Sequence, residues 1–327
     1  GGTRFEYPFA LDQQPLQELG LLDVTRPPFL ADAEGQRDCT DAINEAIRTA
    51  QRYHYVCYFP MGTYLISDTL QAQQYIWWDD YPYDKYRIVQ RSYPVVLMGE
   101  RREDKDGNIE RPTIYLAPYS EGFGFRDHHK EVIHVYNGAA PEENAAPASI
   151  ENMITGLHIK IGEGNTGAVG VAFYAAQGCS MEDCEIDVGD GYCGLWGAAG
   201  NGGSHAQNII RGGRVGVDLS KGTPGAVMSG FIFDHQREHA IIAGTKQAVD
   251  FVGCAIYTAS LLPPVVSFGG TYELFHQGQL SLIDCTVVYD LPMKQGRIQA
   301  VVSSRESIYL IQSFGALTVK YRTNATL

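Results

Sequence analysis

Five polar residues recur at one position of a repeated sequence segment, and their types suit acid–base chemistry on a sugar. Each directly follows an apolar residue, as Asp187 follows Ile186 and Asp234 follows Phe233. Two carboxyl groups ~6.5–9.5 Å apart can cleave a glycosidic bond with inversion, one as general acid and the other as general base. Asp187 and Asp234 are therefore the candidate catalytic pair. The five positions are Lys160, Asp187, Arg211, Asp234 and Tyr257.

Neighbouring residues extend the set of candidates. Glu185 and Glu238 are substitutes for the carboxylate pair, and the block D-H-Q-R-E-H (234–239) adds His235 and Arg237. The alternative chemistry is β-elimination, in which a Lys, Arg, His or Tyr base removes the proton α to a uronate carboxylate. Bound Ca²⁺ would serve such a lyase, whereas a hydrolase needs no cofactor or metal. A further interpretation of the five polar positions is that they form a solvated sheet face with alternating charges. The predicted substrate-binding residues of this face are Lys160, Arg211 and Tyr257.

An aromatic-rich insertion is predicted over residues 71–94. Its central run, Q-Y-I-W-W-D-D-Y-P-Y-D-K-Y-R (74–87), places Trp77, Trp78 and Tyr81 next to carboxylates. Flat rings beside carboxylates suit the C–H faces and hydroxyl groups of sugars, so these three residues are predicted to bind substrate. The alternatives are packing against the rest of the fold and a contact between copies of the chain in a homo-oligomer.

The elements that position these residues are imperfect repeats between Ser149 and Thr318. Each carries short apolar runs, such as I-T-G-L-H-I-K-I (154–161) and M-E-D-C-E-I-D-V (181–188), at a spacing of about two to three dozen residues. No repeat contains a convincing helix. The repeats predict an all-β fold, a single-stranded right-handed parallel β-helix. The alternative, a β-sandwich of hairpins, is disfavoured because two-residue Asn-Gly and Asp-Gly turns are nearly absent from the repeats.

Alignment of the repeats on their inward apolar residues sets the face of the candidate site. Coils of a β-helix stand ~4.8 Å apart, so the backbones of Asp187 and Asp234, two coils apart, are predicted to be separated by about twice that distance. The alignment does not fix the register of the coil that carries Arg211. A slip of one residue would turn the whole site inward. The aligned inward residues are Ile159, Ile186, Phe233, Ile256 and Val287.

A helix before the repeats is predicted to cap the open end of the β-helix. Ile43, Ala46, Ile47 and Ala50 follow helical spacing within residues 38–50. A cap protects the apolar core and the unpaired strand edges at the end of a solenoid. We expect a lead-in over residues 1–30, with a strand near Leu21, and one β-helix domain over residues 31–327.

Two motifs at the predicted cap carry a family resemblance. The patterns D-x-T-x-A-I-x-x-A (38–46) and V-x-x-F-P-x-G-T-Y (56–64) together resemble the N-terminal entry of the pectate-lyase-like superfamily of right-handed parallel β-helix proteins. The Gly-Ala-x-Gly-Asp-Gly stretch that usually precedes the first pattern is replaced by A-D-A-E-G (31–35). The run G-N-T-G-A-V-G-V (164–171) is most like the β-1,3-glucanases of glycoside hydrolase family 55, which are built from two tandem β-helices.

This resemblance implies a fold more strongly than an activity. The superfamily includes polysaccharide lyases, glycoside hydrolases, sugar epimerases and phage tailspikes. The catalytic glutamate of the tandem glucanases matches no residue here, and the set of Asn-Thr-Asp, Asp-Asp and Gly-His-Gly motifs of polygalacturonases is absent. We expect a glycoside hydrolase acting on a neutral or mildly acidic polysaccharide; the alternatives are a polysaccharide lyase and a non-catalytic, glycan-binding or structural β-helix.

Composition limits the partners and the compartment. The 327 residues have a formal net charge of −13, which argues against nucleic acid and anionic membranes as partners. No apolar run approaches the ~20 residues of a membrane span. The seven cysteines fit neither a disulfide framework nor a zinc site, and those at equivalent repeat positions are predicted to be buried. No signal peptide is visible, and the start at Gly1-Gly2 is consistent with removal of a leader, so we expect a secreted or periplasmic protein.

Overall fold

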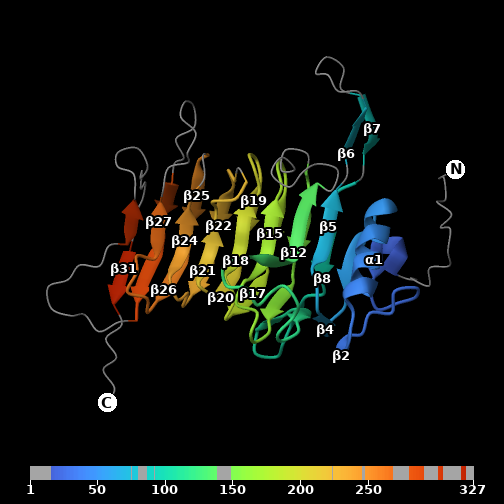
Figure 1. The fold of residues 1–327 in the computed structure, drawn as a ribbon, viewed down its shortest axis with the longest axis horizontal. Helices are drawn as coiled ribbons and strands as arrows, with labels where there is room; N and C mark the ends of the chain where they lie inside the picture. The colour runs from blue at the N-terminus through green and yellow to red at the C-terminus, as the bar shows by residue number, and fades with distance from the viewer. Residues whose placement is uncertain are drawn as a thin grey trace.

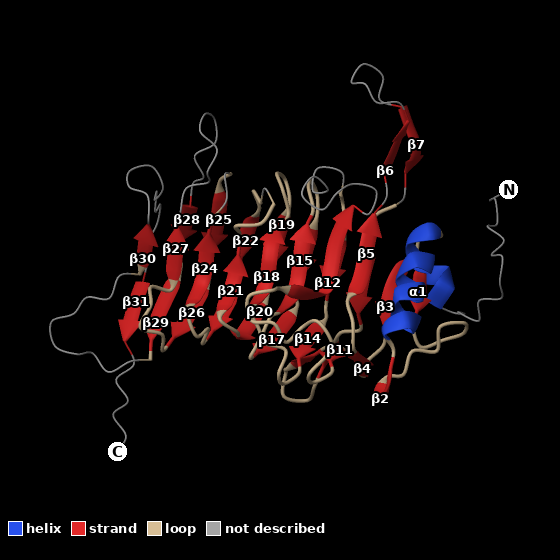
Figure 2. Ribbon diagram, in the orientation of Figure 1, coloured by secondary structure: helices blue, strands red, loops and turns tan. Residues whose placement is uncertain are grey.

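The computed structural model is a solenoid of parallel strands (Figure 1). It describes residues 16–74, 76–79, 87–91, 93–137, 149–222, 224–244, 247–267, 280–290, 301–304 and 318–321. Three parallel sheets, here called A, B and C, run along the solenoid, and successive coils add one strand to each (Figure 2). The predicted all-β, parallel β-helix is confirmed, and the parallel pairing excludes a sandwich of hairpins.

The strands of each sheet follow one another in chain order. Sheet A consists of β1 (Leu21–Asp23), β3 (Val56–Phe59), β8 (Val96–Gly99), β13 (Met153–Thr155), β16 (Ser180–Glu182), β19 (Ser204–Ala206), β22 (Val227–Ser229), β25 (Val249–Val252) and β28 (Leu280–Ile283). Sheet B consists of β2 (Glu34–Asp38), β4 (Thr63–Ile66), β11 (Thr113–Leu116), β14 (His158–Ile161), β17 (Glu185–Gly189), β20 (Ile209–Gly212), β23 (Ile232–Asp234), β26 (Ala255–Thr258), β29 (Thr286–Tyr289) and β31 (Thr318–Tyr321). Sheet C consists of β5 (Leu70–Gln74), β12 (Lys130–Asn137), β15 (Ala168–Tyr174), β18 (Cys193–Ala198), β21 (Val215–Asp218), β24 (His239–Ala243), β27 (Val265–Ser267) and β30 (Val302–Ser304).

A single residue with left-handed backbone turns the chain from sheet A into sheet B. Glycine adopts this conformation without the steric cost of a Cβ, and Asp tolerates it better than most residues do. The next residue points into the core, and sheet B then begins. This one-residue corner repeats in successive coils and keeps sheet B in register. The corner residues are Gly156, Asp183, Gln207, Gly230, Gly253 and Asp284, with φ between 51° and 69°.

The core is one continuous column of side chains enclosed by the three sheets. The residue after each corner contributes to it, and Cys184, Cys254 and Cys285 occupy this position in their coils. Each of the three is at most 2% exposed. All seven cysteines of the chain are free and buried, so the prediction of core cysteines is confirmed.

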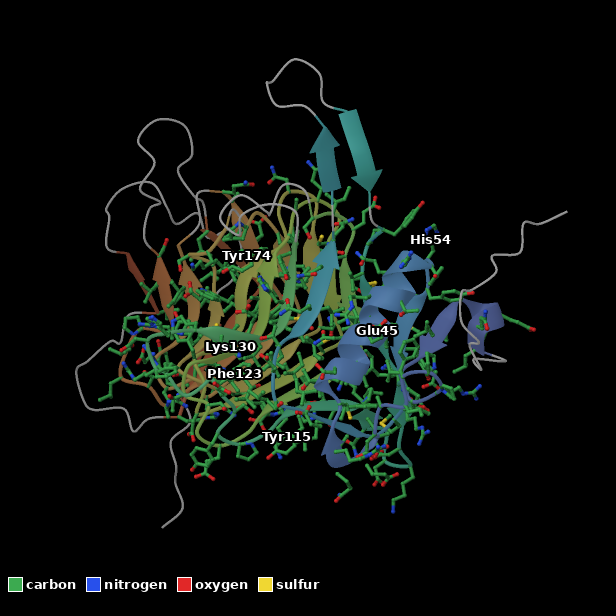
Figure 3. The ribbon with its side chains drawn as sticks, turned by 45° about the vertical axis from the view of Figure 1, so that its right-hand side comes forward. Glu45, His54, Tyr115, Phe123, Lys130 and Tyr174 are labelled. Atoms are coloured by element: carbon green, nitrogen blue, oxygen red, sulfur yellow. The ribbon has the colours of Figure 1, made fainter. Side chains whose placement is uncertain are left out.

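Helix α1 (Thr40–Arg52) packs against β1, β3 and β5 at the N-terminal end of the solenoid. Ile43, Ala46, Ile47 and Ala50 are at most 1% exposed. Glu45 lies on the outer side of the helix (Figure 3) and pairs with Arg48. The predicted capping helix is therefore confirmed, two residues later than expected. A 3-10 turn (Leu16–Leu19) precedes β1, and β1 pairs with β3, so strand pairing begins inside the predicted lead-in. Within the described residues, no helix has the length and apolar character needed to cross a membrane.

Two antiparallel hairpins leave the solenoid. One, β9 (Arg102–Glu103) with β10 (Ile109–Glu110), lies between β8 and β11. The other, β6 (Ile76–Asp79) with β7 (Arg87–Arg91), forms the part of the predicted aromatic insertion that the structure describes and projects beyond sheet C near α1 (Figure 1).

His205 is a buried polar residue on which the interior of the middle coils depends. Its side chain is 0% exposed, and its Nδ1 and Nε2 atoms each lie 3.0 Å from a backbone nitrogen, of Met181 and Ala199 respectively. A neutral imidazole can accept one of these N–H groups, whereas an imidazolium can accept neither. Burial lowers the pKa of His205 to about 3.

We predict that His205 makes the fold sensitive to acid. Because the folded-state pKa lies below the unfolded value of about 6.5, the unfolded chain binds an extra proton between these two values, and stability falls as the pH drops through this range. The loss is about 1.4 kcal/mol per pH unit. Urea unfolding at pH 7 and pH 5 should show a smaller loss of stability in His205→Gln than in the wild type. His128→Gln, at an exposed loop position, should follow the wild type; equal pH dependence in all three proteins would contradict the assignment.

Candidate functional site

The predicted polar ladder lies on the outer face of sheet B. Lys160 pairs with Asp187, Asp187 with Arg211, Arg211 with Asp234, and Asp234 with Tyr257, on strands β14, β17, β20, β23 and β26. The residue before each of them is at most 2% exposed and faces the core, so the alternation of the strands turns the ladder outward. The alignment is confirmed, and it now includes Arg211. The catalytic and binding roles of the ladder residues stay predictions.

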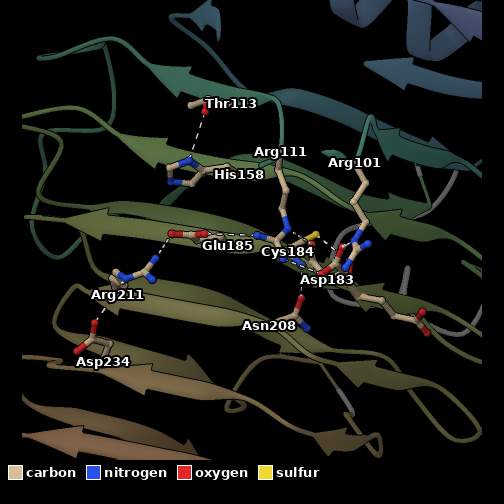
Figure 4. A network of polar contacts seen from close by, with 11 residues as sticks. Arg101, Arg111, Thr113, His158, Asp183, Cys184, Glu185, Asn208, Arg211 and Asp234 are labelled. Atoms are coloured by element: carbon tan, nitrogen blue, oxygen red, sulfur yellow. Dashed lines mark hydrogen bonds and ion pairs between the residues drawn. The ribbon is translucent and has the colours of Figure 1, made fainter. Parts of the chain in front are cut away.

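A continuous chain of opposite charges crosses this face and passes through two members of the ladder (Figure 4). Arg211 contacts Glu185 Oε1 through its Nη1 atom and lies 3.5 Å from Asp234 Oδ2 through its Nε atom. Glu185 Oε2 in turn lies 3.5 Å from Arg111, whose guanidinium is also 2.6 Å from Asp183 Oδ1. Positive and negative groups alternate along this series of contacts. We call this set the charge chain: Arg101, Asp183, Arg111, Glu185, Arg211, Asp234, His235 and Asp290.

His235 joins the last two carboxylates of the charge chain. Its Nδ1 atom lies 2.6 Å from Asp234 Oδ1, and its Nε2 atom lies 2.7 Å from Asp290 Oδ2. Partial burial alone would lower the pKa of His235, but the hydrogen bonds to Asp234 and then to Asp290 outweigh it and raise the pKa above 6.5. A protonated His235 donates from both ring nitrogens, which fits the two carboxylates on either side.

Asp187 differs from Asp234 in its surroundings. It is half-buried between Lys160 and Arg211 in the ladder, yet no ion pair or hydrogen bond of its side chain occurs within the described residues. Lys160 instead places its ammonium 5.4 Å from the centre of the Tyr115 ring, and Arg211 turns towards Glu185 and Asp234. The ladder therefore holds one carboxylate that is anchored by two donors and another that is open to a ligand.

The hairpin between β8 and β11 contributes arginines that the sequence did not indicate. Arg111 is 9% exposed, and its Nε atom donates to the backbone oxygen of Asp183 at 2.7 Å. Arg101 lies 3.3 Å from the same aspartate. The two arginines flank the strands of the hairpin and give no periodic signal, and their contact with a corner residue of a later coil depends on the fold. Asp290, which follows β29, was missed for the same reason.

Two other predicted catalytic residues point away from the ladder. Arg237 donates to the backbone oxygens of Gly189 and Asp190 at 2.7 and 3.0 Å, so it fixes the turn after β17. Glu238 lies 3.2 Å from Arg214, beside sheet C. The structure thus brings Glu185 and His235 to the ladder but leaves Arg237 and Glu238 outside it, and the roles predicted for all four stay untested.

For the predicted aromatic site, the structure describes only the backbone of strands β6 and β7. Trp77 and Trp78 lie on β6, where they pair with Gln90 and Ile88 of β7. Tyr81 falls outside the described residues. Sugar binding by these three residues stays a prediction. Among the described residues, no group of three or more His, Cys, Asp and Glu side chains could hold a metal ion, and the Ca²⁺ expected for a lyase remains untested.

Comparison with known proteins gives one family match. A family model described as rhamnogalacturonase A/epimerase, pectate lyase-like, matches residues 28–260. No match was found among curated proteins.

Several solved structures are similar at low sequence identity. The ORF18 protein of Geobacillus virus E2 is 11% identical, with a TM-score of 0.44 over 94% of this chain and 62% of the viral chain. PfbA, a surface adhesin of Streptococcus pneumoniae, is 13% identical, with a TM-score of 0.44 over 92% of this chain and 89% of that chain. The catalytic unit of an α-1,3-glucanase from Streptomyces thermodiastaticus is 14% identical, with a TM-score of 0.35 over 98% of this chain and 72% of that chain. Structural similarity at these sequence identities and TM-scores gives no information about activity.

We predict that His235 titrates above pH 6.5 and that its charge stabilises the fold at lower pH. Since the folded-state pKa is raised, the stabilisation is fully present below about pH 6.5 and is lost as the pH rises through the folded-state value. Histidine C2–H chemical shifts should give this pKa, and Asp290→Asn should lower it. Asp250→Asn, on the outer face of sheet A, is the control and should leave it unchanged. Titration of His235 at or below pH 6.5 in the wild type would contradict the geometry.

Proposed function

The chain belongs to the rhamnogalacturonase A/epimerase, pectate lyase-like family, and we propose that it is a carbohydrate-active enzyme, a glycoside hydrolase that cleaves a polysaccharide on the outer face of sheet B. The predicted resemblance to the pectate-lyase-like superfamily is confirmed by this membership. Because a polysaccharide is encountered outside the cytoplasm, we further propose that the protein is secreted or periplasmic.

The observation that carries the proposal is the placement of Asp187 and Asp234 on one face, two strands apart in register. Strands of a sheet stand ~4.8 Å apart, so the two backbones are about twice that distance apart. The carboxyl groups of inverting glycosidases are ~6.5–9.5 Å apart, which leaves room for the attacking water. Side chains that lean towards each other by an ångström or two bring the pair into that range.

The roles proposed for the two carboxylates are based on their surroundings. Asp234 is oriented by His235 and Arg211, so it is the general base that accepts a proton from the attacking water. Asp187 has no such anchor and is the general acid. It gives its proton to the glycosidic oxygen as the bond to the anomeric carbon breaks. The oxygen of the water then forms the new bond on the opposite side of the sugar.

The remaining ladder residues are proposed to bind the substrate. Lys160 and Arg211 can donate to sugar hydroxyl groups on either side of Asp187, and Tyr257 lies beside Asp234. Trp77, Trp78 and Tyr81 are proposed as a second contact with the polymer. The net charge of −13 favours a neutral or mildly acidic polysaccharide over a strongly anionic one.

One observation favours the lyase alternative. Lys160 is exposed, and no ion pair of its ammonium occurs in the described part of the chain. Together with Arg211, it could neutralise a uronate carboxylate, while a neutral His or a deprotonated Tyr removes the α-proton. The raised pKa of His235 opposes this role for His235, because its proton is retained near neutral pH.

We predict that Asp187→Asn and Asp234→Asn each lower hydrolysis by about 10²–10⁴-fold, the usual contribution of a positioned acid or base. β-1,3-Glucan, pectin and alginate are incubated with the protein, with and without EDTA. New reducing ends and the ultraviolet absorbance of unsaturated uronates are followed together. Asp250→Asn, an outward aspartate of sheet A, should retain wild-type activity.

The products decide between the alternatives. Reducing ends without unsaturated products, lost in both variants, support hydrolysis by this pair. Unsaturated products would establish a lyase and overturn the assignment of Asp187 and Asp234 as acid and base. Binding of a polysaccharide without any product would establish a non-catalytic β-helix.

A further inference from the structure

The loop that joins β11 to β12, residues 117–129, carries two exposed aromatic side chains. Tyr119 is 70% exposed and Phe125 is 66% exposed. Single exposed apolar residues are normal on protein surfaces and need no explanation by themselves. Tyr119 differs from Phe125 because several contacts hold it in one position.

The ring of Tyr119 rests on the backbone of the turn after β14. A Cβ atom added at Gly164 would lie 2.2 Å from Cδ1 of Tyr119, so one face of the ring covers this glycine. The phenol hydroxyl donates to Glu163 Oε1 at 3.0 Å, and the backbone N–H of Tyr119 donates to the backbone oxygen of Glu163 at 2.8 Å. With 70% of the residue exposed, the opposite face of the ring is open to solvent.

A buried asparagine fixes the loop beneath this ring. Asn165 is 0% exposed; its Nδ2 atom donates to the backbone oxygens of Ala117 and Gly162 at 2.8 and 2.9 Å, and its Oδ1 atom accepts from the N–H of Ser120 at 2.9 Å. Tyr119 itself has a φ of 54°, which is unfavourable for a bulky side chain. Such strain is kept where the surrounding structure enforces it, and it gathers at functional sites. The fold thus holds an aromatic ring in water at a conformational cost.

Two carboxylates lie near the ring of Tyr119. The hydrogen bond to Glu163, followed by the charges of Glu163 and Asp190, raises the pKa of Tyr119, so its hydroxyl keeps its proton. Glu163 follows Lys160 by three residues, and Asp190 follows Asp187 by three residues. The Tyr119 ring therefore lies beside the turn that follows β14, the strand that carries Lys160 of the ladder.

We propose that Tyr119 is a stacking platform for a neutral pyranose unit of the substrate. The apolar C–H face of the sugar lies on the open face of the ring, and its hydroxyl groups donate to Glu163 and Asp190. The same carboxylates repel a uronate, so the platform selects uncharged sugars. This inference rests on the proposed function for its ligand, a polysaccharide that reaches from the ladder to the turn after β14.

Affinity electrophoresis through gels that contain β-1,3-glucan, galactan, xylan or alginate tests the proposal. All proteins also carry Asp187→Asn, so that the polymer is not degraded. We expect at least one neutral polymer to retard the parent protein more than alginate does. Tyr119→Ala should weaken this binding by about tenfold, which corresponds to ~1.4 kcal/mol. Tyr119→Phe, which keeps the ring, should retain most of it.

Phe125→Ala is the matched control, because Phe125 belongs to the same loop and has similar exposure. It should bind like the parent protein, and both alanine variants should unfold at the parent temperature. Equal binding by Tyr119→Ala and the parent, or no retardation by any neutral polymer, would overturn the platform. Hydrolysis by the wild type with no effect of Tyr119 would overturn it while leaving the proposed function intact. Binding that depends on Tyr119, in a protein that cleaves nothing, would overturn the proposed function alone.

Discussion

Stacking of parallel strands in register is the constraint on which the rest of the structure depends. Each strand of sheet B pairs with the equivalent residues of the next coil, from Ile159 and Ile186 to Ile256 and Val287. Inward positions consequently form one apolar column, and outward positions form rows about 4.8 Å apart. The one-residue corner before sheet B maintains this register, because an added residue there would exchange the inward and outward faces.

A row of side chains at this spacing restricts which charges can follow one another. Like charges on adjacent strands repel, whereas opposite charges stabilise the pair modestly. The ladder obeys this rule in Lys160, Asp187, Arg211 and Asp234, whose signs alternate. The charge chain extends the alternation sideways, where Arg111 joins Asp183 to Glu185. Most of its members are partly exposed, so its contribution to stability is small, and its main effect is to fix the orientation of each polar group.

The sequence predicted the features that repeat from coil to coil, and it did not indicate the contacts made by residues outside the repeats. The repeats were sufficient to predict a parallel β-helix and the ladder, because hydrophobic alternation and fixed coil spacing determine both features, and the helical spacing of apolar residues before the repeats predicted the cap. Arg111, Asp183 and Asp290 could not be assigned to the site, since they come from a hairpin, a corner and a strand end. The same holds for Tyr119, whose position depends on a loop that folds back onto a turn 44 residues later. Contacts of this kind follow from tertiary packing rather than from local pattern.

The charge chain also explains why two equivalent aspartates can differ. Asp187 and Asp234 occupy the same ladder position, and Arg211 stands between them. The Arg211 guanidinium contacts Glu185 rather than Asp187 on strand β17, and Asp234 on strand β23, while His235 completes the anchoring of Asp234. Asp187 is left without an anchor because Lys160, its other neighbour, leans over Tyr115. Two aspartates with equivalent backbone positions on a repetitive scaffold can therefore take different roles as acid and base, because the arginine between them contacts one aspartate and not the other.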